Sequence, residues 1–386
     1  MIEQWLNKNI DDLRRLRRWL HQHPEIGFDE YKTSKYLQRK LIDAGYTITQ
    51  TPEMKTGFTC EYGDGHGKTL GIRCDMDALL VQEKSDKDYI SVNDGVTHAC
   101  GHDAHMSIVT GLALYCQDVK PGIDGKIRFL FQPAEEQAPG GAIAMIDGGA
   151  IKDMNHIIAG HVLPKLNGGV IGLKQGPMAA TVESIEINVD GPGGHTSRPA
   201  ESVDLVWVTS HLVISLEESI KHHLDQRDPV VLAFGKVIGG HTFNVLPTRV
   251  SLTGTLRYLN TELKDTLHQI ISDTVKGIEK MTGANISWRV TYTSPGVFND
   301  EEMTNLLIDA SKTAIGNQNI SMLKESSMGG EDFAYYLEHI PGSYYRIGCF
   351  DGCAKDVHVP YFDIDEECIP TAIKVLSETI NLYFKT

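Results

Sequence analysis

The stretch from Thr97 to His105 gathers several side chains that can bind a metal ion. Its sequence, Thr-His-Ala-Cys-Gly-His-Asp-Ala-His, brings together three imidazoles, a thiol and a carboxylate. Thiolate and imidazole are ligands of zinc and its first-row neighbours, and the glycine between Cys100 and His102 tolerates backbone angles that let both side chains converge. By itself, the stretch fits equally well the start of a helix capped by Asp103, with Cys100 as a small buried hydrophobe.

Other candidate ligands come directly after short apolar runs that alternate with helical patterns. Such alternation predicts an α/β fold with a largely parallel sheet, and sites in these folds are assembled at the carboxyl ends of the strands. Taken singly, the aspartates among them could be helix caps and the histidines ordinary packing or loop residues. The candidates are Asp75 and Asp77 after residues 69–74, Glu135 and Glu136 after 126–132, His161 after 156–160, and His358 beyond 344–348.

Together these residues predict a centre for two metal ions. The candidate ligands are more than one tetrahedral site needs, so two ions with a shared ligand fit better. A two-metal centre can activate water and polarise a carbonyl oxygen, which leaves Glu135 to take the proton from the water and pass it to a leaving nitrogen. The predicted reaction is therefore amide hydrolysis. The five candidate ligands are Cys100, His102, Glu136, His161 and His358.

Six motifs give the chain a resemblance to a known family over nearly its whole length. The chain resembles the metal-dependent amidohydrolases of the aminoacylase, hippurate hydrolase and auxin-conjugate hydrolase group. The resemblance implies a catalytic domain with two metal ions, an inserted lid or dimerisation domain, hydrolysis of N-acyl amino acids, and the same five ligands and base. The motifs are Asp75-Met-Asp77-Ala-Leu79, His98-Ala-Cys100-Gly-His102-Asp103-Ala-His105, Gln132-Pro-Ala-Glu135-Glu136, Gly193-Gly194-His195, Gly330-Glu331-Asp332-Phe333 and His358-Val-Pro360.

The resemblance also implies three residues that contact the substrate from the inserted domain. His195 would be catalytic, helping with Asn244 to hold the developing oxyanion or the substrate, either within one chain or across a dimer interface, and Arg257 would pair with the substrate carboxylate. Alternatively, Gly193-Gly194-His195 is only a turn and Arg257 belongs to a surface ion pair. One departure from the family pattern is Leu80, where relatives usually carry proline, and it concerns the shape of the adjoining loop.

The elements that must position these residues fall into two predicted domains. Residues 1–177 and 294–386 form the metal-binding catalytic domain, with helices over about 5–22 and 30–44. Residues 178–293 follow the order β-α-β-β-α-β, which predicts an α+β, ferredoxin-like domain. The resemblance implies that this domain serves as a lid or for dimerisation. The arginines of the first helix, at positions 14, 15, 17 and 18, are interpreted as a solvated helix face rather than a basic patch.

The composition and the opening residues indicate a cellular compartment and exclude some classes of partner. Acidic residues outnumber basic ones by 51 to 36, a formal charge of -15, which argues against nucleic-acid or anionic-membrane surfaces. No basic region followed by an apolar run opens the sequence, and the cysteines are odd in number and scattered, so we expect a cytoplasmic protein with reduced thiols. The partners that the resemblance implies are a small N-acyl amino acid substrate and further copies of the chain, in a homodimer or higher homo-oligomer.

Several alternatives remain open at this point. A dipeptidase or an N-acetyl-diaminopimelate deacetylase would use the same metals, and a non-catalytic metal- or ligand-binding protein would keep the scaffold alone. Zinc, manganese, cobalt and nickel all accept imidazole and carboxylate ligands. The sequence contains no Gly-x-Ser-x-Gly elbow of a serine hydrolase, and its glycine-rich segments lack the spacing or context of nucleotide sites.

Overall fold

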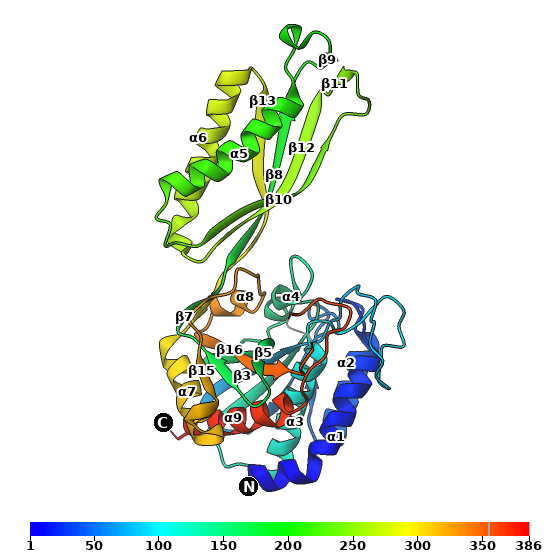
Figure 1. The fold of residues 1–386 in the computed structure, drawn as a ribbon. Helices are drawn as coiled ribbons and strands as arrows, with labels where there is room; N and C mark the ends of the chain where they lie inside the picture. The colour runs from blue at the N-terminus through cyan, green and yellow to red at the C-terminus, as the bar shows by residue number, and fades with distance from the viewer. Residues whose placement is uncertain (354–355, 386) are drawn as a thin grey trace. The chain divides into compact units, whose positions relative to one another are not determined.

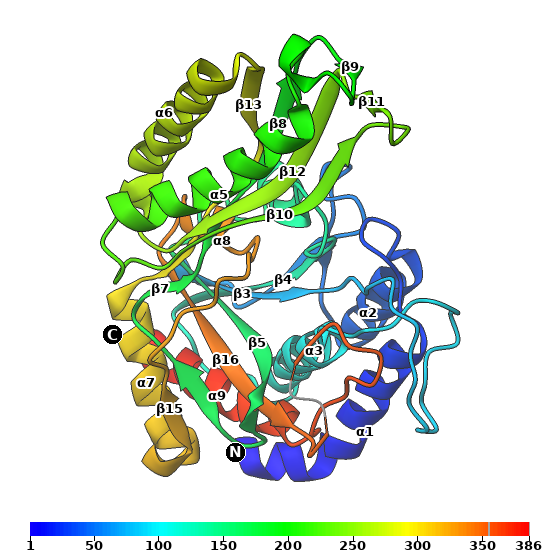
Figure 2. The ribbon, with the colours of Figure 1, turned by 45° about the horizontal axis from the view of Figure 1, so that its top comes forward.

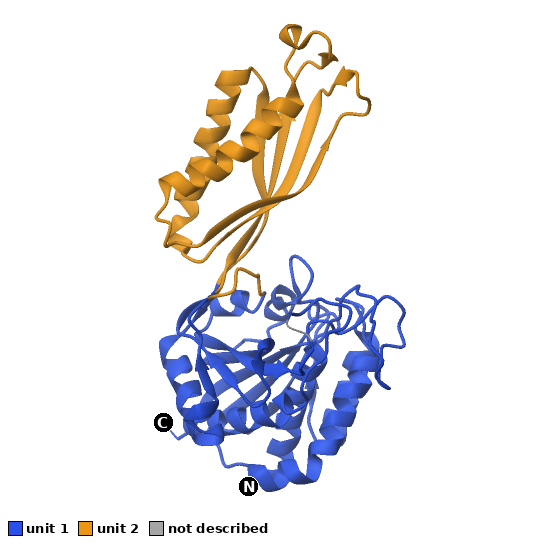
Figure 3. Cartoon of the chain, in the orientation of Figure 1, with its two compact units in different colours: residues 1–178, 297–325, 332–386 blue, residues 179–296, 326–331 orange. Residues whose placement is uncertain are grey.

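The chain forms two compact units. The structure is a computed structural model that describes residues 1–353 and 356–385. Unit 1 comprises residues 1–178, 297–325 and 332–386, and unit 2 comprises residues 179–296 and 326–331 (Figure 3). The chain therefore enters unit 2 from unit 1 and returns to unit 1. That residues 178–293 form a lid or dimerisation domain stays a prediction.

Unit 1 is built on a mixed sheet of eight strands, in the order β1-β2-β4-β3-β5-β16-β6-β15. The central pairs β4–β3, β3–β5 and β5–β16 are parallel, whereas β1–β2, β2–β4 and β16–β6 are antiparallel. This confirms the predicted mostly parallel sheet. The strands are β1 (Ile48–Thr49), β2 (Phe58–Tyr62), β3 (Lys68–Asp75), β4 (Gly125–Gln132), β5 (His156–Asn167), β6 (Ile171–Leu173), β15 (Ile320–Met322) and β16 (Gly342–Phe350); β7 (Gly176–Ala179) and β14 (Val297–Asn299) pair separately.

Helices pack against this sheet because its central strands are apolar on both faces. Every residue of β3 after Lys68 is buried, as expected for a parallel strand covered on both sides. Helix α3 packs between α1 and α9, and α9 also contacts α7 (Figures 1 and 2). The helices are α1 (Ile2–Gln22), α2 (Tyr31–Asp43), α3 (His102–Val119), α4 (Gly141–Asp147), α7 (Glu301–Ile315), α8 (Ala334–Leu337) and α9 (Cys368–Tyr383).

Unit 2 has the predicted βαββαβ order. Its four-stranded antiparallel sheet runs β10-β12-β8-β13, and α5 and α6 pack together over one face with their own hydrophobic core. This is the ferredoxin-like arrangement. Its elements are β8 (Thr181–Asp190), α5 (Leu205–His223), β10 (Val230–Gly239), β12 (Arg249–Tyr258), α6 (Lys264–Thr282) and β13 (Asn285–Ser294), with a small hairpin-like pair, β9 (Gly194–His195) and β11 (Val245–Leu246).

Two predictions about local structure are wrong. His161 does not follow its strand but lies inside β5, which continues to Asn167 because residues beyond His161 still pair with β16. Arg17 is not on a solvated face: its side chain is fully buried, because residue 17 falls in the same helical stripe as Leu13, Leu16 and Leu20.

No helix in the part of the chain described here combines the length and the apolar character needed to cross a lipid bilayer.

Candidate metal centre

Cys100 lies in a tight turn between the loop after β3 and the start of α3. The turn depends on Gly101, whose φ of 82° is one that residues with a side chain rarely adopt. A Cβ at Gly101 would also lie 2.5 Å from Cγ2 of Val162. The glycine therefore allows the turn that the sequence suggested, and it also lets the loop approach β5, which the sequence did not indicate. Asp103 does not cap α3, since the N-cap is Gly101.

His102 is the first residue of α3, and its ring is fixed from one side. Its Nδ1 lies 2.9 Å from the backbone oxygen and 3.1 Å from Oδ1 of Asp77. With Nδ1–H donated there, Nε2 carries the lone pair that a metal needs. This Nε2 is buried without a hydrogen-bond partner and lies 3.9 Å from Oε2 of Glu135 and 3.9 Å from Oε1 of Glu136.

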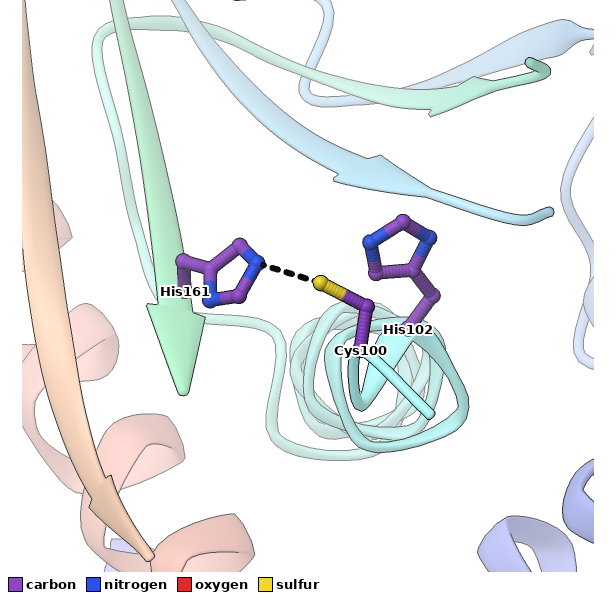
Figure 4. A group of neighbouring side chains, drawn as sticks. All are labelled: Cys100, His102 and His161. Carbon is purple, nitrogen blue, oxygen red and sulfur yellow. Dashed lines mark hydrogen bonds between the residues drawn. The ribbon is translucent and has the colours of Figure 1, made fainter. Parts of the chain in front are cut away.

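His161 approaches the same place from β5. Its Nδ1 donates to the backbone oxygen of Val162 at 2.7 Å, so that the lone pair again sits on Nε2. This nitrogen lies 3.3 Å from the sulfur of Cys100. Figure 4 shows the His161 ring and the Cys100 thiol pointing toward each other, with His102 beside them.

Glu136 and His358 complete the cluster. Residues 133–136 continue from the end of β4, and the backbone N–H of Glu136 donates to Oδ2 of Asp77 at 2.9 Å. His358 comes from the loop between β16 and α9. Its N–H donates to the carbonyl of Ala99, and its Nε2 lies 3.1 Å from Oε1 of Glu136 and 3.3 Å from the sulfur of Cys100.

These contacts form two groups of potential ligands that share one sulfur. Cys100, His102 and His161 each offer an atom within 4.8 Å of the others, and so do Cys100, Glu136 and His358. Soft sulfur, imidazole and carboxylate donors in such groups suit divalent transition metals. The structure thus brings together all five predicted ligands, with Glu135 next to His102.

The electrostatics of the cluster also fit cations. Burial raises the pKa of the Cys100 thiol well above its usual range, and the charges of Glu136 and Glu135 raise it further. Burial lowers the pKa of His102, but Asp75 and Asp77 outweigh this effect and bring it to about 10. The charges of the neighbouring carboxylates raise both pKa values, and a bound cation would offset these charges.

The other two histidines of the Thr97–His105 stretch belong to neither of the two ligand groups that share Cys100. His105 lies behind the cluster: its Nδ1 is 2.6 Å from Oδ1 of Asp75, and its Nε2 accepts the N–H of Val162 at 2.9 Å. His98 is buried, and neither ring nitrogen has a hydrogen-bond partner.

Three residues that support the cluster, Asp75, Asp77 and Arg73, were given no supporting role in the sequence analysis. Asp77 orients both His102 and Glu136, and Asp75 is held by Arg73, whose Nη1 lies 2.7 Å from it. The aspartates were marked by their position after β3. Arg73 had no signal in the sequence, because a buried arginine in an apolar strand is identified only by its partners.

The three residues predicted to contact the substrate all lie in unit 2, but not at one place. His195 is in β9 and pairs with Val245, directly after Asn244, and the N–H of Thr196 donates to the Asn244 carbonyl. Arg257 is near the other end of β12, where its Nη1 donates to the Met328 carbonyl at 2.8 Å. The eight residue steps of β12 from Arg249 to Arg257 span about 26 Å at the usual rise per residue.

Comparisons with known proteins agree on one family. The model of peptidase family M20/M25/M40 matches residues 71–382. The chain is 35% identical to an N-acetyl-L-cysteine deacetylase of Bacillus subtilis, over 94% of the chain and 86% of that protein. It is 34% identical to an N-acetyldiaminopimelate deacetylase of Bacillus cytotoxicus, over 96% and 98%. A solved dinuclear metal-binding peptidase of the M20 family from Bacillus subtilis superposes with a TM-score of 0.87 at 30% identity, covering 97% of the chain and 98% of that structure.

Proposed function

The chain belongs to peptidase family M20/M25/M40, an enzyme family of metal-dependent amidohydrolases and peptidases, and from this premise we propose that it hydrolyses N-acyl amino acids. The family resemblance read from the sequence is thereby confirmed. The proposed products are a carboxylic acid and a free amino acid. Two relatives whose names state deacetylation of an N-acetyl amino acid support this substrate class.

The observation that supports the proposal best is the pair of ligand groups that share the sulfur of Cys100. We assign Cys100, His102 and His161 to one ion and Cys100, Glu136 and His358 to the other, because each group offers three donors within bonding reach of a common centre. When bound, two divalent ions would activate water and polarise the scissile carbonyl. Zinc, manganese, cobalt and nickel all fit these donors.

Glu135 is the proposed general base and acid. Oε2 of its carboxylate lies 3.9 Å from Nε2 of the proposed ligand His102. From there the carboxylate can take a proton from the attacking water. The water oxygen bonds to the carbonyl carbon, the C–N bond breaks, and Glu135 returns the proton to the leaving nitrogen. Water supplies all the atoms of this step, so no further co-reactant is needed.

We propose that two copies of the chain together bind one substrate, through His195, Asn244 and Arg257. His195 lies in β9 and Asn244 directly before its partner strand β11, which precedes the Arg249 end of β12. From that end β12 runs about 26 Å to Arg257, which exceeds the length of a small N-acyl amino acid. If all three contact one substrate, they come from different copies. A homodimer through unit 2 provides this, and β10, an edge strand with exposed Val237 and Ile238, offers a surface for it.

A substrate panel tests the proposed function. Metal-stripped protein is reconstituted separately with zinc, manganese, cobalt and nickel and given acetyl-, benzoyl- and long-chain acyl-amino acids, with release of the amino acid as the readout. We expect hydrolysis with at least one ion. Glu135→Gln should lower kcat by about 10²- to 10⁴-fold with a metal content close to that of the unsubstituted protein. No hydrolysis with any ion refutes the proposal, and an active Glu135→Gln protein refutes the assignment of the base.

A second candidate has specific support. The N-acetyldiaminopimelate deacetylase of Bacillus cytotoxicus matches the chain over almost its full length, and that substrate is also an N-acetyl amino acid. Adding N-acetyl-diaminopimelate and simple dipeptides to the panel separates the deacetylase and the dipeptidase from a general amidohydrolase by their relative kcat/KM.

A further inference from the structure

Glu30 is a buried carboxylate that the proposed chemistry does not use. It directly precedes α2, and its exposed fraction is zero. One carboxylate oxygen accepts the hydroxyl of Thr56 at 2.5 Å, and the other accepts the backbone N–H of Ala134 at 2.8 Å. Burying a carboxylate costs free energy that its contacts must offset. The groups that Glu30 contacts therefore indicate its structural role.

Ala134 is the residue immediately before the proposed base, and its backbone is strained. Its φ is 48°, in the left-handed region that residues with a Cβ rarely adopt because the Cβ lies too close to the following carbonyl oxygen. Such a conformation persists only where neighbours fix it. Here both backbone polar groups are held: Glu30 accepts the N–H, and the carbonyl accepts the N–H of Gly141 at 2.9 Å.

This turn redirects the chain after β4, so that Glu135 and Glu136 follow it toward His102. The segment around Glu30 supports the turn at a second point. The side chain of Gln137 donates to the carbonyl of Gly27 at 3.0 Å, and a Cβ at Gly27 would lie 2.7 Å from Gln137 and 2.9 Å from Ala134. The chain before α2 therefore packs directly on the loop that carries the proposed base.

We propose that Glu30 is a positioning residue for Glu135: by accepting the Ala134 N–H, its carboxylate fixes the left-handed turn from which the base projects. This inference rests on the proposed function, because it takes Glu135 as the base. Glu30 touches neither substrate nor metal in this scheme. It acts through the backbone, and a displacement of the base by about 1 Å can cost about 100-fold in rate.

Three variants separate positioning from general destabilisation. Glu30→Gln keeps an oxygen acceptor of the same length for Ala134 and should retain kcat within about threefold. Glu30→Ala removes the acceptor and should lower kcat by about 10- to 100-fold with little change in KM. Ser34→Ala is the matched control: this buried hydroxyl, one helical turn on, donates to the Thr56 carbonyl at 2.6 Å but does not contact Ala134, so kcat should stay within about twofold.

The measurements are kcat, KM, metal content and thermal unfolding for each protein, together with amide hydrogen exchange of the peptide that contains Ala134. Exchange at Ala134 should be faster in Glu30→Ala and unchanged in Glu30→Gln and Ser34→Ala. The proposal is overturned if Glu30→Ala keeps the kcat of the unsubstituted protein, if Glu30→Gln is as impaired as Glu30→Ala, or if Ser34→Ala loses as much activity.

If Glu30→Ala does not fold, Glu30→Asp takes its place, since the shorter side chain withdraws the acceptor from Ala134 but keeps the carboxylate. It should show a reduced kcat and faster exchange at Ala134, and normal values of both would contradict the proposal. An unsubstituted protein that hydrolyses no member of the substrate panel would refute the proposed function instead. In that case the exchange measurement still decides whether Glu30 holds the turn.

Discussion

The guanidinium of Arg17 in α1 lies 2.8 Å from the carboxylate of Asp103 in the first turn of α3, and neither side chain is exposed. Asp103 follows directly on the proposed ligand His102, and Arg17 also reaches Asp363, 2.5 Å away in the loop before α9. The N-terminal helix is thus tied by charge to the segment that carries the proposed ligands Cys100 and His102.

Removing this guanidinium should destabilise the whole of unit 1. Arg17→Met removes the guanidinium from the buried carboxylate of Asp103 and leaves it the weaker charge partner His21, whose Nδ1 lies 2.7 Å away. This should lower the free energy of unfolding by about 3 kcal/mol, the lower end of the cost of breaking a buried ion pair. Urea denaturation measures it. Arg15→Met, at an exposed arginine of the same helix that forms an ion pair with the exposed Asp12, should change the unfolding curve very little. Equal effects of the two substitutions would contradict a structural role for the buried pair.

Asp77 should control metal affinity without binding the metal. Its side chain orients His102 through Nδ1 and Glu136 through the backbone N–H, and loss of such support typically weakens metal binding about 10- to 100-fold. We expect Asp77→Ala to show this loss in chelator competition. Asp86→Ala, in an exposed loop position, is the control, and an unchanged affinity in Asp77→Ala would show that the ligands keep their geometry unaided.

Loss of the shared sulfur should affect both proposed ions. Because Cys100 belongs to both ligand groups, Cys100→Ser should reduce the bound metal, measured by elemental analysis after gel filtration, to well below two equivalents, and should abolish most hydrolysis. Cys353→Ser, at an exposed free thiol, should leave both quantities unchanged. Full occupancy in Cys100→Ser would exclude the shared-ligand scheme, and metal loss in Cys353→Ser would point to a second site.

Glu30 should make stability depend on pH. Burial, with a smaller contribution from the charge of Asp77, raises the pKa of Glu30 from 4.5 to about 7. Between these values the native carboxyl keeps a proton that the unfolded one has lost, so its contribution to stability is complete below pH 4.5 and is lost as the pH rises to 7. Glu30→Gln has no such loss. In metal-free protein, its unfolding free energy relative to the unsubstituted chain should therefore rise by about 1 to 3 kcal/mol over this range. A difference that is constant with pH would contradict the shift.

Unit 2 should mediate self-association through β10. Val237 and Ile238 on this edge strand are 59% and 57% exposed, and a lysine on an edge strand opposes strand pairing. Val237→Lys combined with Ile238→Lys should move the sedimentation coefficient from that of a dimer to that of a monomer. Met281→Lys, at a site of α6 that is 57% exposed, should not. A protein that sediments as a monomer without any substitution would refute the dimer.

Much of the fold could be predicted from the sequence because its signals are local. Apolar runs such as Thr69–Cys74 mark strands buried on both faces, and the alternation with helices gives the parallel sheet, whose carboxyl ends bring distant side chains together. The five candidate ligands follow from side-chain chemistry combined with that edge. The prediction placed His161 after its strand, whereas it lies within β5. The strand continues past His161 because those residues pair with β16, and the sequence of β5 alone does not show this pairing.

The residues that support the site could not be predicted in the same way. Glu30 looks like an ordinary acidic residue before a helix, and only its contact with Ala134, 104 positions away, shows otherwise. Arg17 did carry a signal, since it occupies a core position between Leu13, Leu16 and Leu20, but charge alone suggested solvent. Contacts between distant segments form only in the complete fold, so the periodicity of the sequence does not reveal them.

The close approach of Gly101 to Val162 restricts how this sequence can diverge. Any residue larger than glycine at position 101 collides with a methyl group of Val162, so the histories of the two positions are coupled: a smaller residue at 162 would have to appear before an alanine at 101 becomes tolerable. Even then the backbone at 101 would still be in a conformation suited to glycine. A smaller residue at position 162 would therefore remove the collision but not the backbone requirement, so two independent restrictions confine position 101 to glycine.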